Sequence, residues 1–172
     1  MKHKILTVLA SGALLTLVAG AQTQSANRMT HDNDFMVKAA EGGMAEVELG
    51  NLAVSHASDP KVKEFGQRMV TDHTKANDEL KMIAKRKGDS LPPVISARDQ
   101  ATKDRLSKLS GAEFDRAYMS DMVKDHKADV SEFRKESNSG SDADYKAFAA
   151  KTLPTLEEHL KLAEETDSQI KK

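Results

Sequence analysis

The sequence contains no cysteine and no tryptophan among its 172 residues. The absence of cysteine excludes disulfide bonds, thiolate metal ligands and thiol catalysis together. Aromatic residues make up only 4% of the chain and proline occurs 4 times. Alanine, leucine, lysine, glutamate and methionine dominate instead, which favours helices over strands. We therefore expect an all-α protein that is stabilised by its packed core.

The chain also carries almost no net charge, since 26 basic residues balance 27 acidic ones. The interleaved charges create no field that would attract nucleic acid or an anionic lipid surface. The sequence has no glycine-rich phosphate loop, no His-Glu-x-x-His pair and no nucleophile elbow. These absences predict a protein that does not bind nucleic acid and is not an enzyme, with no catalytic residues to name.

One long apolar run is present, at residues 5–18 near the N-terminus. Lys2 and Lys4 precede this run and Ala19-Gly20-Ala21 follows it, which is the order typical of an export signal and its cleavage site. We expect residues 1–21 to be a signal peptide, with an uncleaved membrane anchor as the alternative. No later stretch approaches the roughly 20 apolar residues of a membrane span. The mature protein is therefore expected in the periplasm or outside the cell, without integral membrane insertion.

After the signal, about 150 residues remain, the size of one ordinary domain. Residues 22–33 are expected to be a flexible segment and residues 34–172 a helical bundle. Apolar residues recur there at helical spacing, and the expected helices cover residues 34–57, 60–87, 97–109, 111–137 and 142–170. Ser110 with Glu113 predicts a capping box. Gly42, Gly43 and Gly50 each cost about 1 kcal/mol inside a helix, which suggests close approach of a neighbouring backbone.

The connections between the expected helices predict the topology. The first two long helices and the last two are joined by tight turns, so each pair should be antiparallel. The segment between the second and third long helices includes a short helix and can span a bundle length of about 30 Å. This length favours an up-down-down-up bundle with one long crossover, which is the ferritin-like connectivity.

A short motif occurs twice on the expected apolar stripes, as Phe65, Met69, Val70, Asp72 and His73, and again as Tyr118, Met122, Val123, Asp125 and His126. Each copy places a histidine toward the core of the bundle. A buried imidazole must be hydrogen-bonded, paired or metal-bound, because leaving it unsatisfied costs on the order of a few kcal/mol. The motif therefore predicts a polar layer inside the bundle.

The motif and two further segments, residues 39–50 and residues 152–156 with His159-Leu160, resemble the domain of unknown function 4142 family. The resemblance covers residues 34–170. It implies a ferritin-like fold and export, since members are exported bacterial proteins that are often labelled outer membrane proteins. It implies no activity. Without a spanning helix or a lipid anchor, the mature chain could associate with the outer membrane only peripherally.

Each expected long helix places one ionisable residue on or beside its core stripe, at Glu46, His73, His126 and His159. Ferritin-like di-iron proteins carry a glutamate three residues before each ligating histidine. Here those positions are occupied by Val70, Val123 and Leu156. Di-iron carboxylate chemistry is therefore excluded.

A mononuclear site of three histidines and Glu46 remains chemically sensible for zinc, copper, iron or manganese. Helix counting allows Glu46 to face His73, but it places His159 roughly 10 Å further from its turn than His126. The alternative is that Glu46 hydrogen-bonds His73 and no cofactor is bound. The first functional prediction is a non-enzymatic bundle with an envelope or stress-related role and surfaces for a protein partner, and the second is a metal-binding protein. The sequence leaves the oligomeric state open, with a homodimer along one helical face as one alternative.

Overall fold

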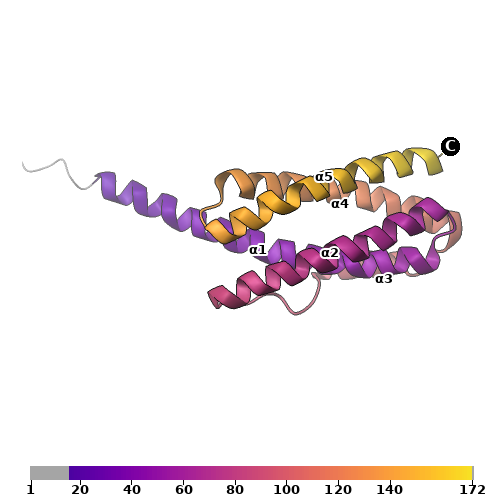
Figure 1. Ribbon diagram of the computed structural model, residues 1–172, viewed down its shortest axis with the longest axis horizontal. Helices are drawn as coiled ribbons and strands as arrows, with labels where there is room; N and C mark the ends of the chain where they lie inside the picture. Colours follow the sequence, from indigo (N-terminus) through magenta and orange to yellow (C-terminus); the bar gives the residue numbers. More distant parts are fainter. Residues whose placement is uncertain (1–15, 172) are drawn as a thin grey trace, which may run out of the picture.

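The computed structural model describes the backbone of residues 16–171 and the side chains of residues 31–171. All elements of the described chain are helices: α1 (Thr16–His56), α2 (Pro60–Lys87), α3 (Ala97–Leu106), α4 (Gly111–Ser139) and α5 (Ala143–Ile170). The four long helices lie side by side, and the N-terminal part of α1 extends beyond them at one end (Figure 1). The predicted all-α class and four-helix bundle are confirmed.

The helices follow the predicted up-down-down-up order. The α1–α2 turn contacts the start of α4, where the Asp115 carboxylate accepts hydrogen bonds from the backbone N–H groups of Ser58 and Asp59, both at 3.0 Å. At the opposite end, Asp32 of α1 accepts bonds from the α4–α5 turn. The crossover that carries α3 therefore returns along the whole bundle (Figure 1), as ferritin-like connectivity requires.

Most predicted helix ends are observed, because their capping groups are present in the sequence. At the start of α2, the Asp59 side chain accepts a bond from the Lys61 N–H at 2.7 Å, and Gly88 follows the last turn in the left-handed conformation with φ 77°. The capping box predicted at Ser110 is wrong, since this side chain makes no capping bond within the described chain. The next residue, Gly111, has a φ of 62° and turns the chain into α4.

The first helix begins much earlier than predicted. α1 starts at Thr16 rather than near Asp34, so residues 22–33 are helical where a flexible segment was expected. The segment contains neither glycine nor proline, and nothing in it interrupts a helix that continues into the bundle. Of the predicted signal peptide, residues 1–15 lie outside the described residues.

Two glycines allow α1 and α2 to pack backbone against backbone. A Cβ atom at Gly50 would lie 2.7 Å from the carbonyl oxygen of Gly66, so no larger residue fits without a shift. The predicted close approach is thus confirmed at Gly50. It is wrong at Gly42, where nothing lies within 4 Å, and Gly43 faces the side chain of Asn77 rather than a backbone.

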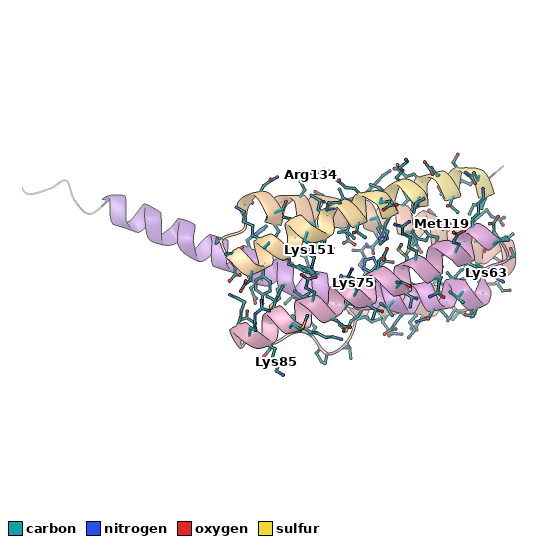
Figure 2. All side chains as sticks on the ribbon, in the orientation of Figure 1. Lys63, Lys75, Lys85, Met119, Arg134 and Lys151 are labelled. Carbon is teal, nitrogen blue, oxygen red and sulfur yellow. The ribbon has the colours of Figure 1, made fainter. Side chains whose placement is uncertain are left out.

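The core consists of two apolar clusters separated along the bundle axis. One contains Phe114 and Tyr118, and the other contains Phe35 and Phe133. Met119 lies between the helices in Figure 2 and is fully buried, whereas charged side chains cover the outside. The predicted polar layer lies between the two clusters and is formed by buried Glu46, His73, His126 and His159. No helix in the described part of the chain is long and apolar enough to cross a membrane.

Candidate metal centre

Three histidines from three helices meet in the polar layer. His73 on α2, His126 on α4 and His159 on α5 are at most 6% exposed. Their ring centroids lie 5.9 Å apart for His73 and His126, and 5.4 Å apart for each of the other two pairs. The offset expected between His126 and His159 does not separate them, in part because α4 continues to Ser139. The three rings therefore form a nearly equilateral triangle.

Each ring directs a free nitrogen into the buried interior. Within residues 31–171, Nε2 of His73, Nε2 of His126 and Nδ1 of His159 have no hydrogen-bond partner. One potential ligand atom from each histidine lies within 4.8 Å of those from the other two. An unpaired buried nitrogen costs about 1–3 kcal/mol. Three such nitrogens in one layer are therefore costly unless they bind something.

The tautomer of His126 follows from its backbone contact. Its Nδ1 lies 3.0 Å from the carbonyl oxygen of Met122. A carbonyl can only accept, so Nδ1 carries the proton and donates it. The lone pair of His126 is consequently on Nε2, the nitrogen without a partner.

The tautomer of His159 follows from a carboxylate. Its Nε2 lies 2.8 Å from Oδ2 of Asp72, which also accepts a bond from Nε of Arg68 at 3.3 Å. The Nε2 proton therefore points to Asp72 and the lone pair lies on Nδ1. Histidine ligands of metals commonly donate their second N–H to a carboxylate or a carbonyl in this way, which orients the ring. Two of the three histidines have such a support.

Burial keeps the three rings neutral. It lowers the pKa of His126 to about 4, and it lowers the pKa of His73 well below its usual value, with further lowering from His126 and His159. Burial also lowers the pKa of His159, although Asp72 acts in the opposite direction. Neutral imidazoles offer lone pairs to a metal at neutral pH, whereas imidazolium ions could not.

Glu46, the predicted fourth ligand, lies outside this triangle. Its carboxylate is fully buried, and Oε1 is 3.8 Å from Nδ1 of His126, the nitrogen that does not face the other histidines. It is grouped instead with Asp125 and Asp129 of α4, since one oxygen from each of the three lies within 4.8 Å of the other two. The structure thus brings the predicted histidines together and places Glu46 on the other side of His126.

Comparison with known proteins identifies the family. Residues 18–166 match the sequence profile of DUF4142, described as a domain of unknown function. The chain belongs to this family. No curated protein matches this DUF4142 chain.

Solved structures share the fold of this DUF4142 protein. A DUF305 fragment from Deinococcus radiodurans has a TM-score of 0.71 and 12% identity, covering 81% of this chain and 96% of that one. A DUF305 protein from Streptomyces coelicolor has a TM-score of 0.68 and 14% identity, covering 81% and 93%. A conserved hypothetical protein from Mycobacterium tuberculosis reaches 0.61 at 14% identity, covering 82% and 93%. At these identities the similarity concerns the fold alone.

Sequence reasoning missed Asp72 as the partner of His159, and it missed a second buried cluster. Asp72 precedes a core histidine by one position, which turns it toward the neighbouring helix. The second cluster joins His31 and Asp32 of α1 to Glu136 of α4, with His31 Nδ1 3.0 Å from Oε2 of Glu136. Both oxygens of Asp32 already accept bonds from the α4–α5 turn. This cluster therefore anchors a turn.

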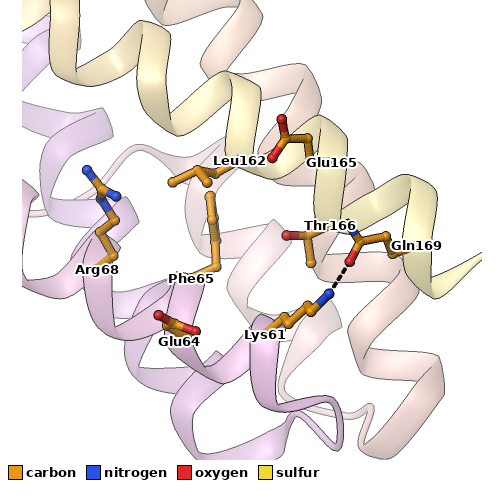
Figure 3. A pocket seen from close by; sticks show the side chains of 8 residues that line it. All are labelled: Lys61, Glu64, Phe65, Arg68, Leu162, Glu165, Thr166 and Gln169. Carbon is orange, nitrogen blue, oxygen red and sulfur yellow. Dashed lines mark hydrogen bonds between the residues drawn. The ribbon is translucent and has the colours of Figure 1, made fainter.

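A surface pocket of about 290 Å³ lies between α2 and α5 (Figure 3). Phe65 projects from α2 toward α5 in this pocket, and its ring centroid lies 6.1 Å from that of His126. Arg68 lines the same pocket and bonds Asp72, the partner of His159. Two residues of the pocket lining therefore adjoin the histidine triangle, Phe65 beside His126 and Arg68 through Asp72.

Proposed function

We propose that this DUF4142 protein is an exported, non-enzymatic helical-bundle protein that binds one transition metal ion through His73, His126 and His159. The observation that carries the proposal is the convergence of three buried imidazoles, each with a nitrogen unpartnered within the described chain. One metal ion would satisfy all three nitrogens at once. His126 donates a hydrogen bond to the Met122 carbonyl oxygen and His159 donates one to Asp72. These bonds fix the protons, so the lone pair of each ring lies on its other nitrogen.

Among the four metals considered from the sequence, the ligand set favours zinc, copper or iron over manganese. Imidazole nitrogens suit zinc, copper and iron, whereas manganese prefers carboxylate and water oxygens. Glu46 contributes no oxygen to the triangle, so the fourth position is left to an exogenous ligand, as in open three-histidine zinc sites. Tetrahedral ligands lie about 3.3 Å apart at ordinary zinc–nitrogen distances. The potential ligand atoms of the three histidines now lie within 4.8 Å of one another, so each would move inward by roughly 1 Å to reach this spacing.

Export and storage of a metal in the cell envelope are consistent with the remaining features. The apolar run at residues 5–18 has the flanks of a signal peptide. The structural neighbour from Streptomyces coelicolor is described as a candidate secreted protein. Phe65, which lines a surface pocket, lies next to His126. We therefore propose metal buffering in the periplasm, with a stress-related role for the protein, as the use of the site.

Metal titration of the purified protein tests this proposal. After treatment with a chelator, Zn²⁺, Cu²⁺ and Co²⁺ are added separately and binding is followed by calorimetry. Visible absorption reports the geometry of Co²⁺. We expect one ion per chain, and loss of binding in His73→Ala and in His159→Ala. His56→Ala is the matched control, because this half-buried histidine instead contacts the Leu109 carbonyl oxygen.

The result that would refute the proposal is a folded protein, verified by circular dichroism, that binds none of these ions at micromolar concentration. Binding that survives His73→Ala and His159→Ala would also refute it, because the ion would then be held elsewhere. In the first case the metal-free envelope protein with surfaces for a protein partner would become the better description.

A further inference from the structure

Three carboxylates converge on the side of His126 that faces away from the other histidines. Asp125 and Asp129 lie one helical turn apart on α4, and Glu46 faces them from α1. One oxygen from each lies within 4.8 Å of the other two. Like charges at this spacing repel one another strongly unless protons or a cation lie between them. The arrangement therefore needs a positive partner.

Glu46 supplies an independent sign that something binds here. Its side chain is completely buried, and neither carboxylate oxygen has a hydrogen-bond partner among residues 31–171. A carboxylate with two free oxygens in the interior is very costly unless it is paired, protonated or bound to a metal. A carboxylate oxygen of Glu46 lies within 4.8 Å of acceptor oxygens of Asp125 and Asp129. The N–H of His126 Nδ1, 3.8 Å from Oε1 of Glu46, donates to the Met122 carbonyl oxygen instead.

Two of the three carboxylates, those of Asp125 and Asp129, border a hollow that is open to solvent, and Glu46 is buried behind them. A pocket of about 320 Å³ is lined by Asp125 and Asp129. Acidic groups outnumber basic ones in its lining, which also includes Glu41, Asp99, Glu132, Lys38 and Arg98. Lys38 is already paired with Glu132 at 3.3 Å. The negative excess would concentrate cations at the mouth of the site.

We propose that Glu46, Asp125 and Asp129 bind a hard divalent cation of the Ca²⁺ class, in a second site that is chemically distinct from the histidine triangle. Ca²⁺ takes six to eight oxygen ligands and accepts carboxylates in one- or two-oxygen contact. Three carboxylates provide the protein ligands, and the open hollow leaves room for water to complete the shell. Zinc or copper in the triangle would use nitrogens, so the two sites differ in the ions that they select.

Calcium titration of the purified, chelator-treated protein tests the second site, because Ca²⁺ has little affinity for imidazole nitrogen. We expect one Ca²⁺ per chain by calorimetry, together with a rise in the unfolding temperature. Asp129→Asn keeps the size of the side chain and should weaken Ca²⁺ binding about tenfold or more, since charge count sets the affinity of such sites. Glu46→Gln should do the same.

Two controls separate this site from its surroundings and from the histidine triangle. Glu132→Gln alters an acidic group of the same hollow that is paired with Lys38, and it should change the affinity less than about twofold. His73→Ala should abolish transition-metal binding and leave Ca²⁺ binding intact. The experiments can therefore refute the Ca²⁺ site and the transition-metal site independently of each other.

Two results would overturn the proposal. The first is a folded protein that shows neither heat nor a change in unfolding temperature up to about 5 mM Ca²⁺, beyond the range of weak extracellular sites. The second is an unchanged Ca²⁺ affinity in both Asp129→Asn and Glu46→Gln. Either result would mean that the carboxyl groups share protons and bind no cation.

Discussion

Replacing Gly50 by alanine tests whether the packing of α1 against α2 depends on a missing side chain. A Cβ atom at this position would lie 2.7 Å from the carbonyl oxygen of Gly66, 3.0 Å from Cγ2 of Val70 and 3.3 Å from Cβ of Met69. The oxygen belongs to the α2 backbone and cannot rotate away as a side chain could. The two helices must therefore separate to accommodate the methyl group.

Two opposing free-energy contributions decide the outcome at Gly50. Alanine is favoured over glycine in a helix interior by about 1 kcal/mol. Overpacking of a well-filled interior typically costs about 1–3 kcal/mol, and the contact with a backbone oxygen places Gly50→Ala toward the upper end. We expect the free energy of unfolding to fall by about 1–2 kcal/mol in total.

Gly42→Ala is the matched control on the same helix. It gains the same helix propensity, but nothing lies within 4 Å of its Cβ position. This variant should raise the free energy of unfolding by up to about 1 kcal/mol. Urea denaturation followed by circular dichroism measures both changes, and unchanged m-values would show that only stability differs. If Gly50→Ala were as stable as Gly42→Ala, the reasoning about backbone contact would be wrong.

Three further substitutions test other parts of the structure. Asp72→Asn removes the carboxylate that orients His159. Calorimetry should therefore show a transition-metal affinity that is reduced about 10–100-fold. An unchanged affinity would contradict the orienting role of Asp72. Asp115→Asn presents a donor to the N–H groups of the α1–α2 turn and should lower the free energy of unfolding by about 2 kcal/mol in urea. Burial and the charge of Asp32 raise the pKa of Glu136 to about 7. The folded protein therefore keeps the Glu136 proton up to about pH 7, whereas the unfolded chain loses it above about pH 4.5. The free energy of unfolding should fall as the pH rises between these two values. Glu136→Gln should flatten this part of the pH profile, and an unaltered slope would place its origin elsewhere.

Helix positions were largely predictable because their determinants are local. Pro60 and Gly88 mark the ends of α2 in the sequence, and both the predicted start and the predicted end are observed. The start of α1 was predicted near Asp34 but lies at Thr16. No residue between the signal region and the bundle interrupts a helix, and none marks its beginning. The capping box at Ser110 failed because Gly111 adopts a left-handed conformation there.

The candidate site was predictable only to the level of one polar residue on each long helix. The helical period of 3.6 residues determines which face of a helix a side chain occupies, so Glu46 and the three histidines could be assigned to the core from the sequence alone. The period does not determine how far one helix is shifted along another. Helix counting could therefore not establish that His126 and His159 are level.

The sequence by itself determined the helices, their order and the polar identity of the middle layer, because these depend on local spacing and on the lengths of the connections. Only the tertiary structure decided how that layer is divided. The packing of α2, α4 and α5 sets the shifts along the bundle axis that bring the three imidazoles together. The packing of α1 against α4 places Glu46 near two carboxylates of α4. One polar layer thereby becomes two chemically different sets of ligands, nitrogen on one side of His126 and oxygen on the other.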